Sequence, residues 1–184
     1  MMRRQILAAL RVLLVLTVLV GVLYPLAVTA VARLTMPKRA EGSLVESGGE
    51  VVGSSLIGQE SSGPEWFHGR PDPFDPRASG PSNLGPSSDE LASEIRLTLG
   101  RLEVDETLDG PIPADAITGS GSGLDPHISP EYARLQVPRV AGARHLPESQ
   151  VLALVAHFTE GRTLGFLGEP RVNLLLLNLA LVGN

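Results

Sequence analysis

Apolar residues are concentrated near the front of the chain, in a run that carries no charge. The run begins at Val12, ends at Ala32 and reads VLLVLTVLVGVLYPLAVTAVA. At about 1.5 Å per residue, a helix of this length reaches roughly 31 Å, which is the thickness of a bilayer core. The pattern therefore predicts a membrane-spanning helix.

The alternative is a signal peptide that is removed, because residues 30–32 have the small-x-small form that signal peptidases accept. The run is, however, much longer than the roughly 7 to 15 residues of a signal-peptide apolar region. Tyr24 suits a membrane interface, Pro25 is tolerated in a spanning helix, and Gly21 lets a neighbouring helix approach closely. These features favour a retained anchor.

Helical periodicity returns well beyond this run. Ser87 and Glu90 form a capping-box pattern, which predicts a helix that starts at Ser87. The apolar positions that follow fall on one helical face: Leu91, Ile95, Leu99 and Leu102.

Two further helices are expected towards the end of the chain. Ser129 is placed as an N-cap with Pro130 at the first helical position, and Pro138 should break or kink this helix. The second helix covers residues 148–159 and ends before Gly161. Its buried face consists of Val151, Leu154, Val155 and Phe158.

The remaining segments are expected to be strands and loops. Residues 51–59 indicate a strand interrupted by turn residues, and the proline-rich residues 61–86 indicate an ordered loop. Residues 108–118 are expected to form a turn and then a short strand. We interpret residues 171–182, RVNLLLLNLALV, as a strand, because turn residues precede this short run and both of its faces are apolar.

The predicted fold class is α+β, with one amino-terminal transmembrane helix followed by a single soluble α+β domain. Residues 1–34 would form a cytoplasmic tail and the span, and residues 35–50 a connector. Residues 51–184 would form an extracytoplasmic domain. All 20 Asp and Glu residues lie beyond Ala32, and this asymmetry favours an inward amino terminus. The basic residues beside the span are nearly balanced, with Arg3, Arg4 and Arg11 before it and Arg33, Lys38 and Arg39 after it.

Composition excludes several classes of site. The chain has no cysteine, which rules out disulfides, thiolate metal sites and cysteine nucleophiles. Lys38 is the only lysine, so a phosphate-binding loop with its Gly-Lys-Ser/Thr ending is excluded. The acidic part beyond the span should repel nucleic acid and anionic lipid.

The stretch TGSGSGLDPHISPEYA, residues 118–133, is the strongest candidate for chemistry. Glycine stands at position 121, where a nucleophile elbow needs serine. Asp125 and His127 offer a base with its orienter or two metal ligands, but residues two apart on an extended loop should point to opposite sides. The other histidines, at positions 68, 145 and 157, lie in unrelated contexts. We therefore expect no catalytic residue and no metal site.

The structural alternative for this stretch is a specialised turn. Glycines would adopt positive φ, serine hydroxyls would satisfy the turn backbone, and Asp125 or Ser129 would cap the next helix. So many special backbone positions in a row also suit a binding loop on an anchored domain.

Several longer motifs carry a family resemblance that covers nearly the whole chain. They are GSSLIGQ from Gly53, FHGRP from Phe67, ASGPSNLGP from Ala78, SGSGLDPHIS from Ser120, Gln136, PRVAGAR from Pro138 and GRTLGFLGEPRVNLLLLNLAL from Gly161. Together they closely resemble the C subunit of the bacterial potassium-transporting P-type ATPase, the Kdp system. The sequence departs from the family pattern at Trp66, Pro81, Leu175 and Leu177.

The resemblance implies an accessory, non-catalytic subunit of a high-affinity potassium uptake pump in the cell (inner) membrane, with a single span. Its implied partners are a channel-like potassium-translocating subunit, an ATP-hydrolysing P-type subunit and a small single-span subunit, besides membrane lipid and without nucleic acid. The family is described as a catalytic chaperone that raises the ATP affinity of the pump. ATP is therefore implied only by the resemblance, no firmly bound cofactor is expected, and potassium is the transported ion.

Two other functions compete with this reading. A membrane-tethered hydrolase needs a nucleophile with a base, which the motifs do not offer. An independent solute-binding lipoprotein or secreted domain needs a lipid-bearing cysteine, which the chain lacks, or a cleaved signal. For the pump subunit, the expected partner-contact or loop-defining residues are Trp66, Phe67, His68, Arg70, Asn83, Ser120, Gly121, Ser122, Gly123, Asp125, His127, Gln136, Arg139, Arg144, Glu169, Arg171 and Asn173.

Overall fold

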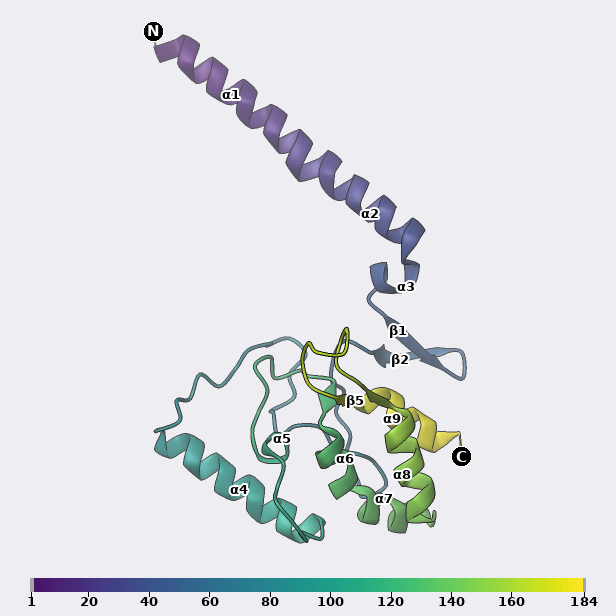
Figure 1. Cartoon of the computed structure of the whole chain (residues 1–184). Helices are drawn as coiled ribbons and strands as arrows, with labels where there is room; N and C mark the ends of the chain where they lie inside the picture. The colour runs from purple at the N-terminus through teal and green to yellow at the C-terminus, as the bar shows by residue number, and fades with distance from the viewer. Residues whose placement is uncertain (1, 184) are drawn as a thin grey trace. The chain divides into compact units, whose positions relative to one another are not determined.

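The computed structural model describes residues 2–183, and the chain falls into two compact units, Met1–Leu44 and Val45–Asn184. The first unit is a long helix followed by the short helix α3, Pro37–Ala40 (Figure 1). The long helix runs without interruption through α1, Met2–Val18, a π-helical turn, Leu19–Leu23, and α2, Tyr24–Thr35. It is long and apolar enough to cross a membrane by length and composition, as predicted.

The π-helical turn lies immediately before Pro25. A proline inside a helix lacks an N–H group, and its ring presses on the carbonyl four residues earlier, here that of Gly21. The wider turn relieves this clash, and the N–H of Tyr24 donates to the carbonyl of Leu19, five residues back. The helix thus passes through Pro25 without breaking.

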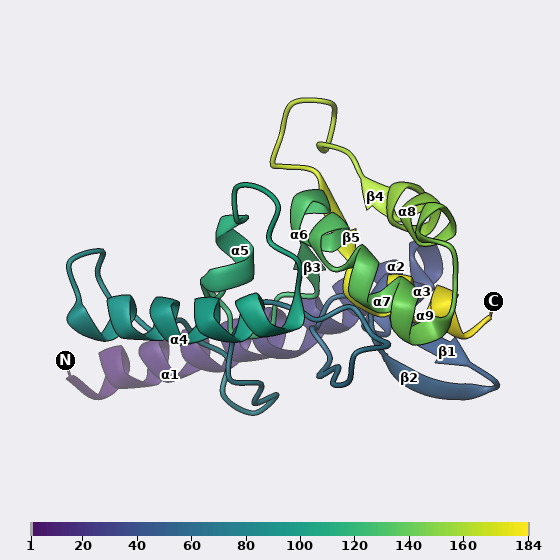
Figure 2. The same cartoon turned by 90° about the horizontal axis from the view of Figure 1, so that it is seen from below.

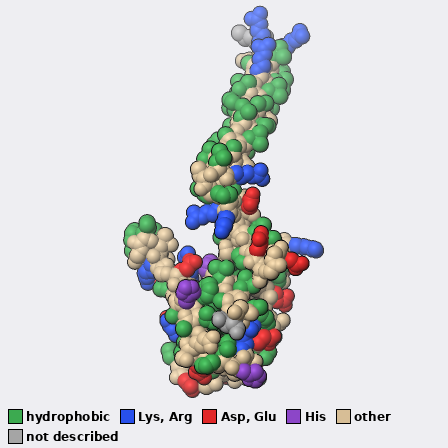
Figure 3. Space-filling view, turned by 90° about the vertical axis from the view of Figure 1, so that its right-hand side faces the viewer, with side chains coloured by type: hydrophobic (Ala, Val, Ile, Leu, Met, Phe, Trp, Pro, Cys, Tyr) green, Lys and Arg blue, Asp and Glu red, His purple; other side chains and the backbone are tan. Residues whose placement is uncertain are grey.

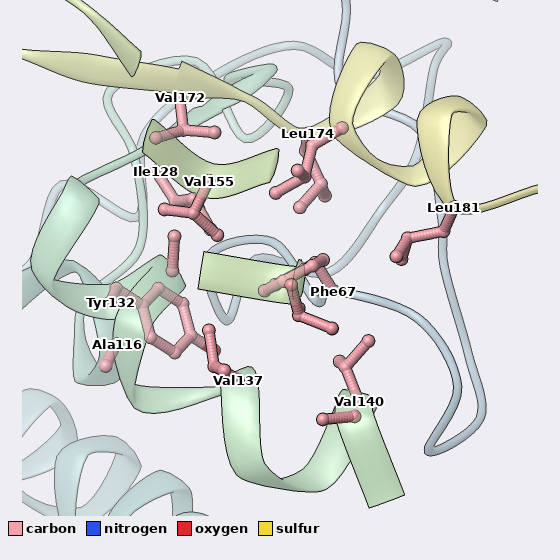
Figure 4. Packing of buried hydrophobic residues seen from close by; sticks show 14 of the residues in the cluster. Phe67, Ala116, Ile128, Tyr132, Val137, Val140, Val155, Val172, Leu174 and Leu181 are labelled. Atoms are coloured by element: carbon pink, nitrogen blue, oxygen red, sulfur yellow. The ribbon is translucent and has the colours of Figure 1, made fainter. Parts of the chain in front are cut away.

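The second unit is built on a small antiparallel sheet in the order β3-β5-β4. These strands are His127–Ile128, Arg171–Asn173 and Thr159–Glu160. The helices that pack around it are α6, Pro130–Leu135, α7, Val137–Arg144, α8, Glu148–His157, and α9, Leu174–Val182. Figure 4 shows side chains from the sheet and from these helices meeting in one apolar interior.

The core of this unit also takes in a residue from a segment without regular structure. Phe67 is fully buried, although residues 55–88 contain neither helix nor strand. Its neighbours in the core include Val137, Val140, Val151, Val155, Val172, Leu177 and Leu181. The predicted ordered loop over residues 61–86 therefore lies against the core and contributes to it.

The remaining elements lie outside this sheet. Strands β1, Leu44–Ser47, and β2, Glu50–Ser54, form a separate two-stranded sheet. Helix α4, Asp89–Asp105, and the short helix α5, Ala114–Ile117, precede the glycine-serine stretch. Figure 3 shows Asp and Glu side chains on the second unit, while the helix of the first unit is apolar with Lys and Arg near both ends.

Three predicted helices are confirmed with small changes. In α4, Leu102 is buried and the predicted face points inward, but the cap is Ser88, whose Oγ accepts from the N–H of Leu91. In α6, Ser129 is the N-cap as predicted, and the helix stops at Leu135. Pro138 lies in the first turn of α7, which begins at Val137. Helix α8 ends at His157, two residues earlier than expected.

Three predicted strands need correction. Only residues 171–173 of the last apolar run form a strand, because the side chain of Asn173 accepts from the N–H of Leu176 and starts helix α9. Residues 114–117 are helical instead of extended. The strand predicted over residues 51–59 ends at Ser54, where the hydroxyl accepts from the N–H of Leu56 and turns the chain. The predicted domain boundaries at residues 35 and 51 stay predictions.

Candidate functional site

Two buried side-chain amides hold the irregular segment 55–88 against the core. The Asn178 amide of α9 accepts from the N–H of Phe67 at 2.9 Å and donates to its carbonyl at 2.9 Å. The Gln136 amide, between α6 and α7, accepts from the N–H of His68 at 2.7 Å and donates to its carbonyl at 3.0 Å. Each amide thus supplies one donor and one acceptor, as a neighbouring β-strand would. We call this pair the amide clamps.

Arg139 of α7 also binds the segment just before Phe67. Its guanidinium donates to the carbonyls of Pro64 at 2.7 Å and Trp66 at 2.9 Å, and to Oε1 of Gln136 at 2.8 Å. It also pairs with Glu106, with 2.7 Å between Nε and Oε1. One cation therefore joins α7, the segment before Phe67 and the end of α4.

Burial shifts the pKa of two groups near Arg139, the Glu106 carboxyl and the His68 ring. Desolvation raises the pKa of Glu106 above its ordinary value, although the bond from Arg139 opposes the shift. Oε2 of Glu106 is buried and lacks a hydrogen-bond partner among the described residues. Desolvation, and then the charge of Arg139, lowers the pKa of His68, whose Nε2 lies 2.8 Å from the Gly63 carbonyl. Both groups therefore favour their neutral forms more than in water.

Arg144, at the end of α7, fixes the next part of the segment. Its Nε donates to the Glu65 carbonyl at 2.7 Å, and its Nη1 donates to the Leu181 carbonyl at 3.0 Å. The guanidinium lies 4.3 Å from the centre of the Trp66 ring, in a cation–π contact. Trp66 thus packs on an internal arginine in this structure.

The glycine-serine stretch is tied to the same segment by charged side chains. Nη2 of Arg70 donates to the carbonyl of Thr118 at 3.1 Å and to the carbonyl of Gly119 at 2.5 Å. Both carboxylate oxygens of Asp72 accept from the N–H of Ser120 at 2.9 Å. The carboxylate of Asp72 therefore already binds the main-chain N–H of Ser120 in this loop.

The serines of this stretch satisfy their own loop. The Ser120 hydroxyl accepts from the N–H of Gly123 at 2.8 Å, and the Ser122 hydroxyl accepts from the N–H of Leu124 at 3.1 Å. The Ser122 carbonyl accepts from the N–H of Gly80 at 2.8 Å. These amides are therefore bonded internally, which confirms the structural reading of the serines as turn-satisfying residues.

Glycine is required at one of the two predicted positions of this loop. Gly123 has a φ of +68°, and an added Cβ would lie 3.2 Å from the Gly80 carbonyl oxygen. Gly121 does not have a positive φ, and open space surrounds its Cβ position. The expectation of special backbone geometry is thus confirmed for Gly123 and wrong for Gly121.

Asp125 and His127 face each other, contrary to the expectation that they point to opposite sides. Oδ1 of Asp125 accepts from the N–H of His127 at 2.9 Å and lies 3.4 Å from its ring Nδ1. The side-chain turn that Asp125 makes around Pro126 brings the ring back over the carboxylate. The contact with His127 lowers the pKa of Asp125, and Arg70, 3.9 Å away, adds to the effect.

Ser129 and Asn173, which cap α6 and α9, are also bonded to distant parts of the chain. Asp115 of α5 accepts from the N–H of Ser129 at 2.6 Å and from its hydroxyl at 2.9 Å, while that hydroxyl caps α6. Asn173 donates to the Ser55 carbonyl at 2.8 Å in addition to capping α9. Strand β3 pairs with β5 so that His127 lies opposite Asn173.

Three candidate residues lie away from this network. Asn83 is exposed with a φ of +57°. Glu169 pairs with Arg162 at 2.5 Å, and Arg171 pairs with Glu160 at 2.9 Å. The structure therefore brings most of the predicted residues onto the contact between residues 55–88, α7 and the glycine-serine stretch, but not these three.

Four residues of the network were not predicted from the sequence: Asp72, Glu106, Asp115 and Asn178. Asn178 carried a usable signal, since an amide in the run LLLLNLALV needs a partner when that run is buried. The three carboxylates carried no local signal, because their partners are separated from them by 14 to 48 residues.

The polar side chains of this site mainly form hydrogen bonds to other parts of the same chain. Within residues 2–183, no group of three or more His, Asp or Glu gathers in a way that could hold a metal ion. A shallow hollow of about 330 Å³ opens beside α5, lined by Pro111, Ile112, Pro113, Ala114, Asp115, Ser129 and Glu131. The carboxylate of Asp115 in this hollow is already bonded to Ser129.

Comparison with known proteins gives one consistent result. The sequence model of the family described as "K+-transporting ATPase, c chain" matches residues 6–182. The "Potassium-transporting ATPase KdpC subunit" of Methylobacterium nodulans is 51% identical over 182 residues, which cover 90% of each chain. The subunit of the same name from Kineococcus radiotolerans is 54% identical over 183 residues, or 97% of this chain and 93% of the relative.

A third relative matches over almost its full length. The "Potassium-transporting ATPase KdpC subunit" of Mycobacterium tuberculosis is 50% identical over 186 residues, covering 98% of each chain. The matches include the span, the glycine-serine stretch and the last helix, because they extend over nearly all residues. The chain therefore belongs to the KdpC family, the C subunits of potassium-transporting ATPases.

Proposed function

We propose that this chain is a non-catalytic accessory subunit that assembles and stabilises the potassium pump by presenting a rigid surface to other subunits. The observation that carries the proposal is the use of the motif side chains. Gln136, Arg139, Arg144 and Arg70 all donate to main-chain carbonyls. These bonds hold residues 64–68 and 118–119 in place, as a scaffold requires.

The proposed partners are the channel-like potassium-translocating subunit, the ATP-hydrolysing subunit and the small single-span subunit. The span would lie among their helices, with a short tail in the cytoplasm and the second unit outside. The restriction of acidic side chains to residues beyond the span supports this orientation. An alkaline phosphatase fused after residue 184 should be active, and a reporter that works only in the cytoplasm should be silent. The reverse pattern would contradict the orientation.

The Asp125–His127 pair provides the test that separates a scaffold from a catalyst. In a scaffold, Asp125→Ala and His127→Ala lose a local turn contact, so the purified complex should retain potassium-stimulated ATPase activity. A catalytic role predicts fully assembled complex without ATPase activity, because only the transition state would lose an interaction. Yield of complex and activity per complex are measured on the same preparation, so the two outcomes are distinct.

A second candidate role concerns ATP. The family resemblance implies that the subunit raises the ATP affinity of the pump. The amides of Ser120, Gly123 and Leu124 are bonded within the chain, and Asp72 places a carboxylate beside them. Phosphate would meet an occupied and negatively charged loop there. We therefore expect any effect on ATP affinity to act through contact with the ATP-hydrolysing subunit, so that the purified full chain alone retains no labelled ATP.

A further inference from the structure

Residues 161–170, between β4 and β5, form a braced projection from the second unit (Figure 2). Glu160 lies opposite Arg171 in the β4-β5 register, and Arg162 pairs with Glu169 further out. Beyond them Thr163 and Leu167 form a bridge, with N–H groups donating to the opposite carbonyls at 2.9 Å in both directions. Successive cross-links therefore give this projection a defined shape.

Its end is apolar and open to solvent. The exposed fraction is 79% for Leu164, 68% for Phe166 and 49% for Leu167. We call these three residues the apolar tip. Large apolar side chains that gather on a small exposed surface commonly mark an interaction site.

Leu164 also has an unfavourable backbone conformation. Its φ is +56°, and the next residue, Gly165, has a φ of +84°. Two successive positive φ values favour Asn-Gly or Gly-Gly, because a side chain with a Cβ clashes in the left-handed region. Leucine is a poor choice for this turn on local grounds. Strained positions of this kind are found where the side chain itself has a role.

We infer that the apolar tip inserts into an apolar recess on the polypeptide surface of another subunit of the pump. The inference rests on the proposed function and names the surface through which the scaffold binds. A braced, preformed tip loses little conformational entropy on entering a recess of matching shape. Aromatic residues such as Phe166 are enriched at the buried centre of protein interfaces, and the two leucines beside it add apolar area.

A protein recess fits these residues better than a lipid surface. Binding to anionic lipid is strengthened by unpaired basic residues near the inserted apolar group. Here the arginines beside the tip, Arg162 and Arg171, are paired with Glu169 and Glu160. Lipid insertion also requires no fixed shape, whereas the strained turn at Leu164 fixes one.

The sharpest variant is Leu164→Asn in the full chain, expressed with the other subunits. Asparagine accepts the left-handed conformation more readily than leucine, so the thermal midpoint should stay the same or rise. Complex recovered in detergent should nevertheless fall roughly tenfold or more, as expected for loss of a central interface residue. Phe166→Ser should lower recovery without strain at that position. Leu152→Gln, which removes a 42% exposed leucine from α8, is the matched control and should leave recovery unchanged.

A photo-crosslinking residue at position 166 identifies what the tip touches in membranes. A crosslink to another pump subunit supports the inference. Crosslinks only to lipid or only to a second copy of this chain would overturn it, as would normal recovery of both tip variants. Omitting the whole chain tests the proposed function separately. If the remaining subunits assemble and transport potassium normally without it, the accessory role fails, whatever the tip variants do.

Discussion

Phe67 and His68 each bury main-chain groups, and a buried N–H or C=O without a partner costs roughly 1–3 kcal/mol. Their segment has no neighbouring strand to provide partners, since residues 55–88 lack regular structure. The side-chain amides of Asn178 and Gln136 take this place, with four hydrogen bonds of 2.7 to 3.0 Å. At the scale of single residues, the stability of the segment depends on these two amides.

Substitution of either amide clamp by an isosteric apolar residue should be costly. We expect Gln136→Met or Asn178→Leu to lower the free energy of unfolding by about 2–4 kcal/mol, because two main-chain groups lose partners at once. Gln150→Met, at an exposed position of α8, is the control and should change stability by less than about 0.5 kcal/mol. Urea denaturation of the purified full chain measures both. Equal midpoints for the Gln136 and Gln150 variants would contradict the clamp.

The Glu106–Arg139 pair should respond to mutation asymmetrically. Arg139→Met leaves a buried carboxylate unpaired and should cost about 3–5 kcal/mol. Glu106→Gln keeps a hydrogen-bond acceptor for Arg139 and removes a charge that burial disfavours, so its effect near neutral pH should be small. Denaturation midpoints of the two variants give the comparison. Similar losses for both would show that the carboxylate charge itself is needed.

The same pair predicts a pH dependence. The folded-state pKa of Glu106 is raised, so the folded chain binds this proton more tightly than the unfolded chain. The contribution of Glu106 to stability is therefore fully present below its ordinary pKa of 4.5 and decreases as pH rises through the raised value. Relative to wild type, Glu106→Gln should gain stability as pH rises over that range. Parallel stability curves for the two proteins would contradict this assignment.

At the scale of elements, the glycine-serine stretch depends on one glycine more than on the other. Gly123→Val would place a β-branched side chain at a φ of +68° and against the Gly80 carbonyl, at a cost of about 1–3 kcal/mol. Gly121→Val enters open space and should change stability little. Thermal midpoints and yield of complex measure both effects. A larger loss for Gly121→Val would show that the loop changes conformation in the assembled pump.

The pattern of the sequence predicted some elements and missed others for identifiable reasons. Helices α4, α6 and α8 carry caps and one apolar face, which are local signals. The run after Asn173 is apolar on every face, so its period cannot separate a buried strand from a buried helix. The side chain of Asn173 decides for the helix, and it also reaches Ser55, 118 residues away. Contacts of that kind leave no trace in local sequence, which is why the site was predicted only in part.

At the scale of the whole molecule, the second unit should fold without the first, whereas stable association with the pump should require both units. Among the residues that the structure describes, the buried core extends from Phe67 to Leu181, so deletion of residues 1–32 should leave a folded second unit. We expect this shortened chain to lose stable association with the pump, since it can no longer pack its helix among the others in the membrane. Circular dichroism and co-purification measure the two outcomes.

An unrelated single-span helix in place of residues 1–32 provides the control for that deletion. Recovery of the complex with the replaced helix would show that the native span acts only as a tether. Co-purification of the shortened chain at the wild-type level would contradict any requirement for the span. The apolar run predicted the span itself, but a run of this kind does not determine which helices pack against it.

The hydrogen bonds between Phe67 and Asn178 also set an order of events during synthesis, because 111 residues separate their two ends. The ribosome completes residues 55–88 long before it reaches α9, so the segment emerges without the side chain that later holds it. Long-range contacts of this kind slow folding and leave apolar groups exposed in the meantime. Phe67 is one of those groups, and we expect it to stay accessible to chaperones and proteases until α9 has emerged and Asn178 can bind the segment. The contact between this segment and α9 is therefore expected to form late in folding.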